Sequence, residues 1–149
     1  STVEELLDEV MHLSDLVALT ALESMMSDFA VFHPRYRTAE AVVWVPSESR
    51  LAEELGHELA KALGVTAISA RVAPGSRATK AKNTDLEKSE ACLAVHRFDV
   101  DAEELPASVL LIDEVWTTGE TMAALSEACL RVMPEGERFV GALVVGVAR

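Results

Sequence analysis

The chain has 149 residues, about the length of one compact domain, since domains usually run to roughly 100–150 residues. Half of the residues are hydrophobic and 26% are charged, which excludes collagen-like, low-complexity and wholly disordered chains. Thirteen Lys and Arg against 25 Asp and Glu give a formal charge of −12, which opposes sequence-independent binding to nucleic acid or to an anionic membrane. We therefore expect one folded domain without direct nucleic-acid or membrane binding, in which any anionic ligand is held locally.

The sequence shows no sign of a disulfide framework, a metal site, a membrane-spanning helix or a secretory signal. Cys92 and Cys129 lie in apolar stretches and form no C-x-x-C pair, so neither a zinc ribbon nor a disulfide framework is expected. The longest uncharged run, residues 139–148, is about half as long as a membrane-spanning helix. The acidic start of the chain lacks the basic and apolar order of a secretory signal, which favours the cytoplasm. The histidines lack the spacing of metal ligands, and we expect surface or hydrogen-bonded side chains at His12, His33, His57 and His96.

The N-terminal part of the chain has helical periodicity. Residues 2–30 carry apolar side chains at spacings of three and four, which predicts one bent amphipathic helix or two shorter ones. His33-Pro34 ends that pattern. Residues 40–46 form a short apolar run rich in β-branched side chains, which predicts a strand buried on both faces with Trp44 in the core.

The middle of the chain continues with a helix and a strand. Residues 49–63 place apolar side chains on one side and mostly acidic ones on the other and end at Gly64, which predicts a capped amphipathic helix. Residues 65–72 predict a second strand, and residues 91–100 are compatible with another. Residues 71–84 contain four basic residues and no acid, the only such basic segment of this acidic chain.

The last third of the chain repeats the alternation. Residues 108–113 predict a strand, residues 121–133 a helix and residues 139–148 a final buried strand. Apolar strands that alternate with amphipathic helices predict an α/β fold, with a central parallel sheet flanked by helices and joined by right-handed crossovers.

The junction between residues 109 and 121 is the strongest candidate site. Asp113 and Glu114 follow the apolar strand, and five residues then open the helix: Thr117, Thr118, Gly119, Glu120 and Thr121. A helix N-terminus offers unpaired N–H groups and a partial positive charge, so hydroxyls and a glycine there suit a phosphate. The alternative is that Thr117 only caps the helix, with Glu120 as its capping-box partner and Gly119 easing the turn.

A buried strand, two acids and then Thr-Thr-Gly-x-Thr resemble the 5-phosphoribosyl-1-diphosphate (PRPP) motif of the type I phosphoribosyltransferases. A broader similarity to their ComF subgroup rests on the run 43–64, the basic segment and Phe98, and spans roughly residues 39–149. The resemblance implies a Rossmann-like phosphoribosyltransferase domain over residues 39–149. Residues 1–38 would then be an N-terminal helical segment that serves as a hood over the site, a linker or a dimer contact.

The resemblance also implies roles for individual residues. Asp113 and Glu114 would accept hydrogen bonds from the ribose 2- and 3-hydroxyls, and residues 117–121 would bind the 5-phosphate. The diphosphate loop would consist of Ser47, Glu48, Ser49 and Arg50. Residues 71–83 would form a mobile flap with Arg77, Lys80 and Lys82 as its cations, or else a plain solvated loop. Mg²⁺ would be the cofactor and would bridge diphosphate and ribose oxygens, held mainly by the substrate and not by a protein cage.

Glu48 and Glu120 depart from the phosphoribosyltransferase motif, and Trp116 has two interpretations. A carboxylate at Glu120 would repel a 5-phosphate unless it points away. Glu48 lies in a diphosphate loop that contains no glycine, so that Arg50 alone would offset its charge. Trp116 either packs under the phosphate loop or faces the ligand.

The expected function is binding of PRPP or a nucleotide 5-phosphate, with transfer of phosphoribose to a nitrogenous base. One alternative is a non-catalytic PRPP or nucleotide sensor, or an accessory domain of a larger DNA-processing or regulatory protein. Another is an interaction module that binds no small ligand. The sequence leaves open a homodimer or a larger parent chain.

Overall fold

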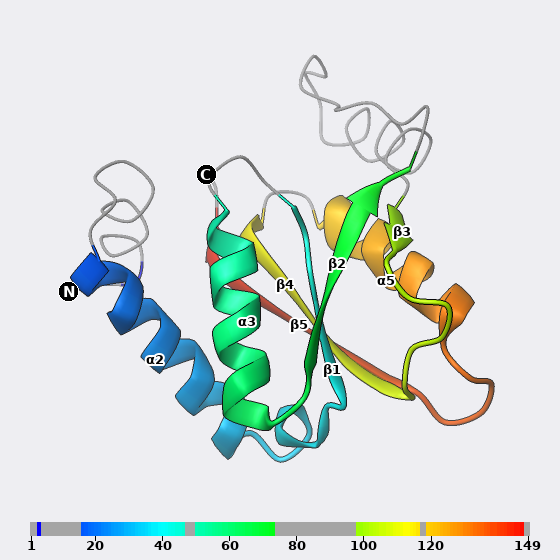
Figure 1. Ribbon diagram of the computed structural model, residues 1–149, viewed down its shortest axis with the longest axis horizontal. Helices are drawn as coiled ribbons and strands as arrows, with labels where there is room; N and C mark the ends of the chain where they lie inside the picture. The colour runs from blue at the N-terminus through cyan, green and yellow to red at the C-terminus, as the bar shows by residue number, and fades with distance from the viewer. Residues whose placement is uncertain (1–2, 4–15, 47–49, 74–97, 117–118, 148–149) are drawn as a thin grey trace.

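The computed structural model describes residues 3, 16–46, 50–73, 98–116 and 119–147 (Figure 1). In these residues the helices are α2 (Leu16–Phe32), the short 3-10 helix η1 (Tyr36–Thr38), α3 (Leu51–Leu63) and α5 (Glu120–Val132). The strands are β1 (Ala41–Trp44), β2 (Thr66–Val72), β3 (Phe98–Val100), β4 (Ser108–Trp116) and β5 (Phe139–Val147). Of the predicted N-terminal helix or helices, the part over residues 4–15 lies outside the described residues.

The strands form one sheet in the order β3-β2-β1-β4-β5. β1 is the middle strand and pairs in parallel with β2 and β4, and β4 pairs in parallel with β5. The central parallel sheet is therefore confirmed. The edge strand β3 differs, because it pairs antiparallel with β2 through the register Ala70↔Val100 to Val72↔Phe98. The sequence of a three-residue strand carries no information on its direction. The direction depends on the path of the chain that connects β2 to β3.

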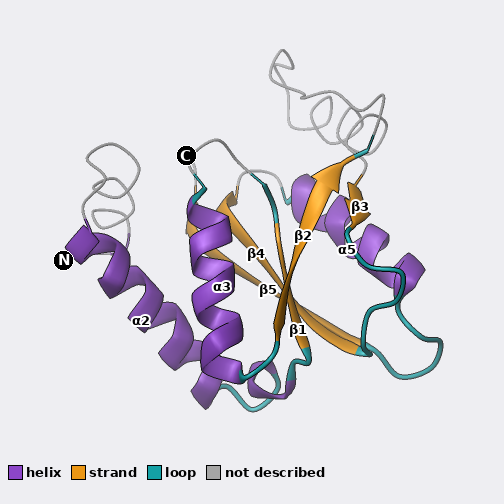
Figure 2. Ribbon diagram, in the orientation of Figure 1, coloured by secondary structure: helices purple, strands orange, loops and turns teal. Residues whose placement is uncertain are grey.

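Helices cover both faces of the sheet (Figures 1 and 2). α2 and α3 lie side by side on one face, where Leu55 and Leu59 of α3 pack against Leu110 and Ile112 of β4. α5 lies on the other face, where Leu125 belongs to the second buried cluster. β1 and β4 are buried on both sides, as expected of central parallel strands. No helix in the described part of the chain is long and apolar enough to cross a membrane.

The strand β4 is longer than its apolar run. The sequence predicted a strand over residues 108–113, yet pairing with β5 continues to Trp116↔Val147. Asp113 was predicted as the last residue of the strand, whereas in the structure both Asp113 and Glu114 lie inside β4 and two further strand residues follow them. Polar residues carry no local strand signal, and here it is the backbone hydrogen bonding to β5 that extends β4.

β5 forms one edge of the sheet, and a tyrosine covers part of that edge. The hydroxyl of Tyr36 donates to the carbonyl oxygen of Ala142 at 3.1 Å and accepts from the N–H of Ala142 at 3.3 Å. The guanidinium of Arg35 lies 4.6 Å from the ring centroid of Phe139 at the start of the same strand. The segment after α2 thus satisfies backbone groups that an edge strand would otherwise expose.

Gly141 packs too tightly for any larger residue. A Cβ at this position would lie 2.8 Å from Leu110 Cδ2, 2.8 Å from Tyr36 Cε1 and 3.0 Å from Phe139 Cζ. We expect Gly141→Ala to lower the free energy of unfolding by about 2 kcal/mol, because the surrounding side chains must leave their rotamers. Urea denaturation measures the loss, and an unchanged midpoint would mean that this contact relaxes freely. Shortening one neighbour in the double variant Gly141→Ala/Leu110→Val should reduce the cost of the alanine.

Candidate active site

The candidate site lies where β1 and β4 end side by side. These adjacent parallel strands continue toward helices on opposite faces of the sheet, β1 toward α3 and β4 toward α5. Such a reversal of direction opens a crevice beyond the carboxyl ends of the strands, where ligands bind in open α/β sheets. The topology therefore brings together Arg50 at the start of α3, the acids of β4 and Gly119 at the start of α5.

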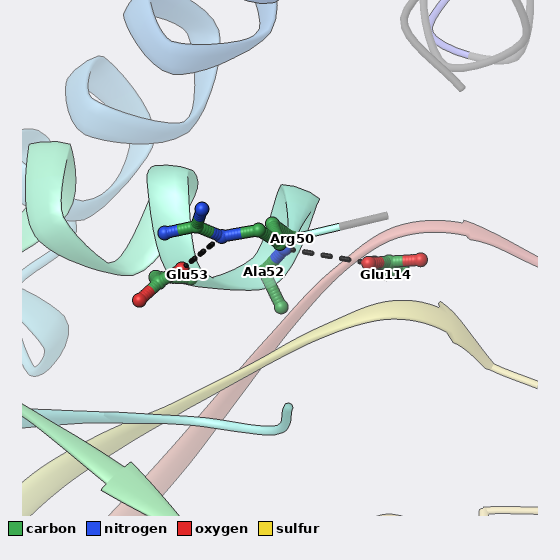
Figure 3. A network of polar contacts seen from close by, with 4 residues as sticks. All are labelled: Arg50, Ala52, Glu53 and Glu114. Carbon is green, nitrogen blue, oxygen red and sulfur yellow. Dashed lines mark hydrogen bonds and ion pairs between the residues drawn. The ribbon is translucent and has the colours of Figure 1, made fainter. Parts of the chain in front are cut away.

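Glu114 points into the core beneath the start of α3. Its side chain is buried, with 7% of the residue exposed, and its Oε1 accepts a hydrogen bond from the N–H of Ala52 at 3.4 Å (Figure 3). Among the charged and polar residues that the structure describes, Glu114 alone is buried. The sequence predicted that both acids would contact ligand but could not predict this contact, because α3 and β4 are far apart in the chain.

Asp113 is partly buried and has a raised pKa. Burial raises the pKa of its carboxyl to about 6, and the negative charge of Glu114 adds to that effect. A hydrogen bond opposes the shift, because the N–H of Glu114 donates to Asp113 Oδ1 at 2.7 Å. A carboxyl with a perturbed pKa at the end of a strand is typical of a functional position.

Arg50 immediately precedes α3 in a left-handed backbone conformation, with φ 60° and ψ 12°. Its Nε donates to Glu53 Oε2 at 2.8 Å, within the first turn of the helix (Figure 3). This hydrogen bond raises the pKa of the guanidinium. The sequence predicted that Arg50 would offset the charge of the diphosphate loop, yet its side chain is already paired with an acid of its own helix.

The backbone of Arg50 supplies a test of local strain. Arg50→Gly and Arg50→Ala both remove the ion pair with Glu53, but only glycine adopts a positive φ without a steric cost. We expect the glycine variant to melt about 3 °C above the alanine variant. Differential scanning calorimetry compares the two. An alanine variant of equal or higher Tm would show that Arg50 does not hold the left-handed conformation in solution.

α5 begins two residues later than the capping interpretation predicts. Its N-cap is Gly119, in the left-handed conformation at φ 84°, and the carbonyl oxygen of Gly119 accepts from the N–H of Ala123 at 3.0 Å. Thr117 is therefore not the N-cap, and the capping box of Thr117 with Glu120 is wrong. Glu120 and Thr121 occupy the first turn of the helix, as an anion site at its N-terminus requires.

Several predicted site residues lie outside the described residues. These are Ser47, Glu48 and Ser49 of the diphosphate loop, Thr117 and Thr118 of the phosphate loop, and Arg77, Lys80 and Lys82 of the flap. Arg71, the first residue of the basic segment, belongs to β2 and is paired in register with Asp99 of β3. The backbone of Trp116 ends β4.

His33 and Cys129 lie in surroundings typical of residues with a structural role. His33 Nδ1 accepts from the N–H groups of Arg35 and Tyr36, at 3.1 and 3.2 Å. Cys129 is buried in α5, and burial raises the pKa of its thiol to about 12. Within the described ranges, no group of three or more His, Cys, Asp or Glu side chains could hold a metal ion.

An apolar hollow away from the candidate site was not predicted. An apolar hollow of about 320 Å³ lies between α2 and the last part of β5. Its lining is Val3, Leu22, Met25, Met26, Phe29, Leu143, Val144 and Val145. The apolar spacing of Met25 and Phe29 on α2 was visible in the sequence, but the sequence could not show that these two side chains remain about half exposed.

No protein-family model matches the sequence, and no curated protein matches it. Solved structures do match. Adenine phosphoribosyltransferase from Giardia lamblia, complexed with 9-deazaadenine, has a TM-score of 0.62 at 18% identity, over 95% of this chain and 84% of that one. Orotate phosphoribosyltransferase from Aeropyrum pernix has a TM-score of 0.56 at 18% identity, over 89% of this chain and 60% of that one. The chain has the phosphoribosyltransferase fold.

A third structure with this fold was solved with ligands. Adenine phosphoribosyltransferase from Trypanosoma brucei, in complex with AMP, pyrophosphate and ribose-5-phosphate, has a TM-score of 0.56 at 14% identity, over 89% of this chain and 66% of that one. The chain therefore spans about two thirds or less of the Aeropyrum and Trypanosoma enzymes. The fold class predicted from the strand and helix pattern is confirmed.

Proposed function

We propose that this chain is a phosphoribosyltransferase-like domain, similar to the ComF subgroup, that binds PRPP or a nucleotide 5-phosphate and transfers phosphoribose to a nitrogenous base. One observation carries the proposal. In a chain with the phosphoribosyltransferase fold, the acidic end of β4 lies at the switch point between the N-termini of α3 and α5. Asp113 supplies a carboxylate for sugar hydroxyls, and the two helix N-termini supply N–H groups for phosphate oxygens.

The proposed reaction exchanges one bond at the anomeric carbon of the ribose. The C1–oxygen bond to diphosphate breaks, the electron pair leaves with the diphosphate, and a nitrogen atom of the base forms the new bond to C1. The proton of that nitrogen passes to water or to the departing diphosphate. Positive charge develops on the ribose in the transition state. The carboxylate of Asp113 accepts from a ribose hydroxyl, which orients the ring and favours that charge. Residues 117–121 hold the 5-phosphate and residues 47–50 the diphosphate.

Mg²⁺ fits the residues present. It prefers oxygen ligands, retains several waters and takes substrate phosphate oxygens in place of a full protein cage. The carboxylate oxygens of Asp113, near the carboxyl end of β4, are donors of this kind. When bound, the ion would neutralise the charge of the departing diphosphate.

Ligand-dependent melting tests the binding step. PRPP with Mg²⁺ should raise the Tm of the wild-type chain, because a ligand bound only by the folded state stabilises it. Asp113→Asn should lose most of that increase, whereas Asp101→Asn, the same change at an exposed position after β3, should keep it. No increase at millimolar PRPP with Mg²⁺ would refute the proposal.

A non-catalytic sensor or accessory domain is the second candidate, and one contact favours it. Arg50, the only cation of the proposed diphosphate loop, is paired with Glu53, which leaves less positive charge for a departing diphosphate. Diphosphate release on adding a panel of purine and pyrimidine bases separates the two functions. Release supports the transferase, and PRPP binding without release for any base supports the sensor.

A further inference from the structure

The two acids of β4 lie on opposite faces of the sheet. Ile112 packs in the core beneath α2 and α3, whereas Leu111 packs beneath α5. Side chains alternate along a strand, so Glu114 continues the face of Ile112 and Asp113 the face of Leu111. The hydrogen bond from α3 to Glu114 agrees with this placement. Each acid is thus directed toward a different helix, although the sequence resemblance assigned both acids to the ribose.

Glu114 accepts a hydrogen bond from the first turn of α3. Ala52 is the second residue of that helix and is fully buried, and its N–H belongs to the first turn, where no intrahelical acceptor exists. The carboxylate of Glu114 accepts from this N–H and lies at the positive end of the helix dipole (Figure 3). Burial of a carboxylate is costly without such partners, so the contact ties the end of β4 to the start of α3.

We propose that Glu114 is a positioning residue: it fixes the start of α3, and with it Arg50, whereas Asp113 is the acid that contacts the ribose hydroxyls. This division of roles rests on the proposed function only for the ligands that it names. The hydrogen bond between Glu114 and the N–H of Ala52 is present without a ligand. Loss of the Glu114 carboxylate should therefore weaken binding of diphosphate, and loss of the Asp113 carboxylate should weaken binding of the ribose.

The first test needs no ligand. Glu114→Gln keeps the side-chain volume and a carbonyl acceptor for Ala52, so the exchange rate of the Ala52 amide hydrogen should stay within about threefold of wild type. Glu114→Ala removes the acceptor and should speed exchange at Ala52 about tenfold relative to the buried Leu125 amide of α5. Unchanged relative exchange in Glu114→Ala would overturn the proposal. If that variant does not fold, rapid exchange at Ala52 in Glu114→Gln would overturn it.

The second test separates the ligands. Diphosphate with Mg²⁺ and ribose 5-phosphate are titrated separately by calorimetry into the wild-type chain, Glu114→Ala, Glu114→Gln and Asp113→Asn. Glu114→Ala should weaken diphosphate binding by up to about tenfold, because fixing the start of α3 then costs free energy comparable to the lost hydrogen bond to Ala52, and should leave binding of ribose 5-phosphate nearly unchanged. Glu114→Gln should restore diphosphate binding to within about threefold of wild type. Asp113→Asn should weaken binding of ribose 5-phosphate more than it weakens binding of diphosphate with Mg²⁺.

The outcomes distinguish the two proposals. If Glu114→Gln weakens ribose 5-phosphate as much as Asp113→Asn does, Glu114 contacts the ribose and the inference is wrong. If the wild-type chain binds neither ligand, the proposed function is wrong, and the exchange rate of Ala52 still decides whether Glu114 fixes the start of α3.

Discussion

Asp113→Asn is expected to weaken PRPP binding between about tenfold and a hundredfold while making the protein more stable at neutral pH. The loss of affinity follows from replacing a charged acceptor of ribose hydroxyls by a neutral one. The gain in stability follows from burial, which raises the pKa of Asp113 to about 6 and makes its ionised form costly in the folded state. Asparagine avoids that cost and can keep the hydrogen bond from the N–H of Glu114.

The sign of the pH dependence follows from the same shift. An unfolded Asp titrates at about 3.9. Between about pH 4 and pH 6, the folded protein holds a proton on Asp113 that the unfolded chain has lost, so stability falls as the pH rises through this window and levels off above it. The loss is on the order of 3 kcal/mol. Urea denaturation from pH 4 to pH 8 should show this decline in the wild type and a flatter profile in Asp113→Asn.

A control and two outcomes make this prediction decisive. Asp101→Asn removes the same charge at an exposed position and should change neither the affinity for PRPP nor the pH profile. PRPP affinity in the wild type should fall below about pH 6, because the proton then competes with the ribose hydroxyls. If Asp113→Asn binds PRPP normally, the ribose site lies elsewhere. If it is less stable than wild type at pH 8, burial is not what raises the pKa.

Gly119→Val is expected to abolish binding of the 5-phosphate. Gly119 has φ 84°, a conformation that a β-branched residue adopts only with strain of roughly 1–3 kcal/mol. The branched side chain would also stand at the N-cap of α5, where the N–H groups of the first turn face the proposed phosphate. Titration with ribose 5-phosphate measures binding, and urea denaturation measures the accompanying loss of stability.

Gly136→Val is the matched control. Gly136 also has a positive φ, 106°, and a Cβ there would meet no atom within 4 Å. It lies in the connection before β5, at the opposite end of that strand from the candidate site. We expect a similar loss of stability in both variants but loss of phosphate binding only in Gly119→Val. Equal binding by the two variants would count against a phosphate site at the start of α5.

The elements of the sheet could be predicted from local patterns. The apolar runs of β1, β4 and β5 and the amphipathic period of α3 and α5 are properties of neighbouring residues, and they correctly predicted a parallel α/β fold. The junction at residues 113–121 could be found in the same way, because strand, acids and helix start follow one another in the chain. The direction of β3 could not, because it depends on where a distant segment pairs.

The sequence by itself determined that Asp113, Glu114 and Gly119 lie close together where a buried strand leads into a helix, since spacing along the chain sets that order. Only the tertiary structure decided what each residue faces. Pairing with β5 extends β4 to Trp116, and the alternation of that longer strand turns Glu114 toward α3 and Asp113 toward α5. The physical reason is that strand ends, side-chain direction and helix contacts depend on hydrogen bonds between segments far apart in the chain, which no local pattern encodes.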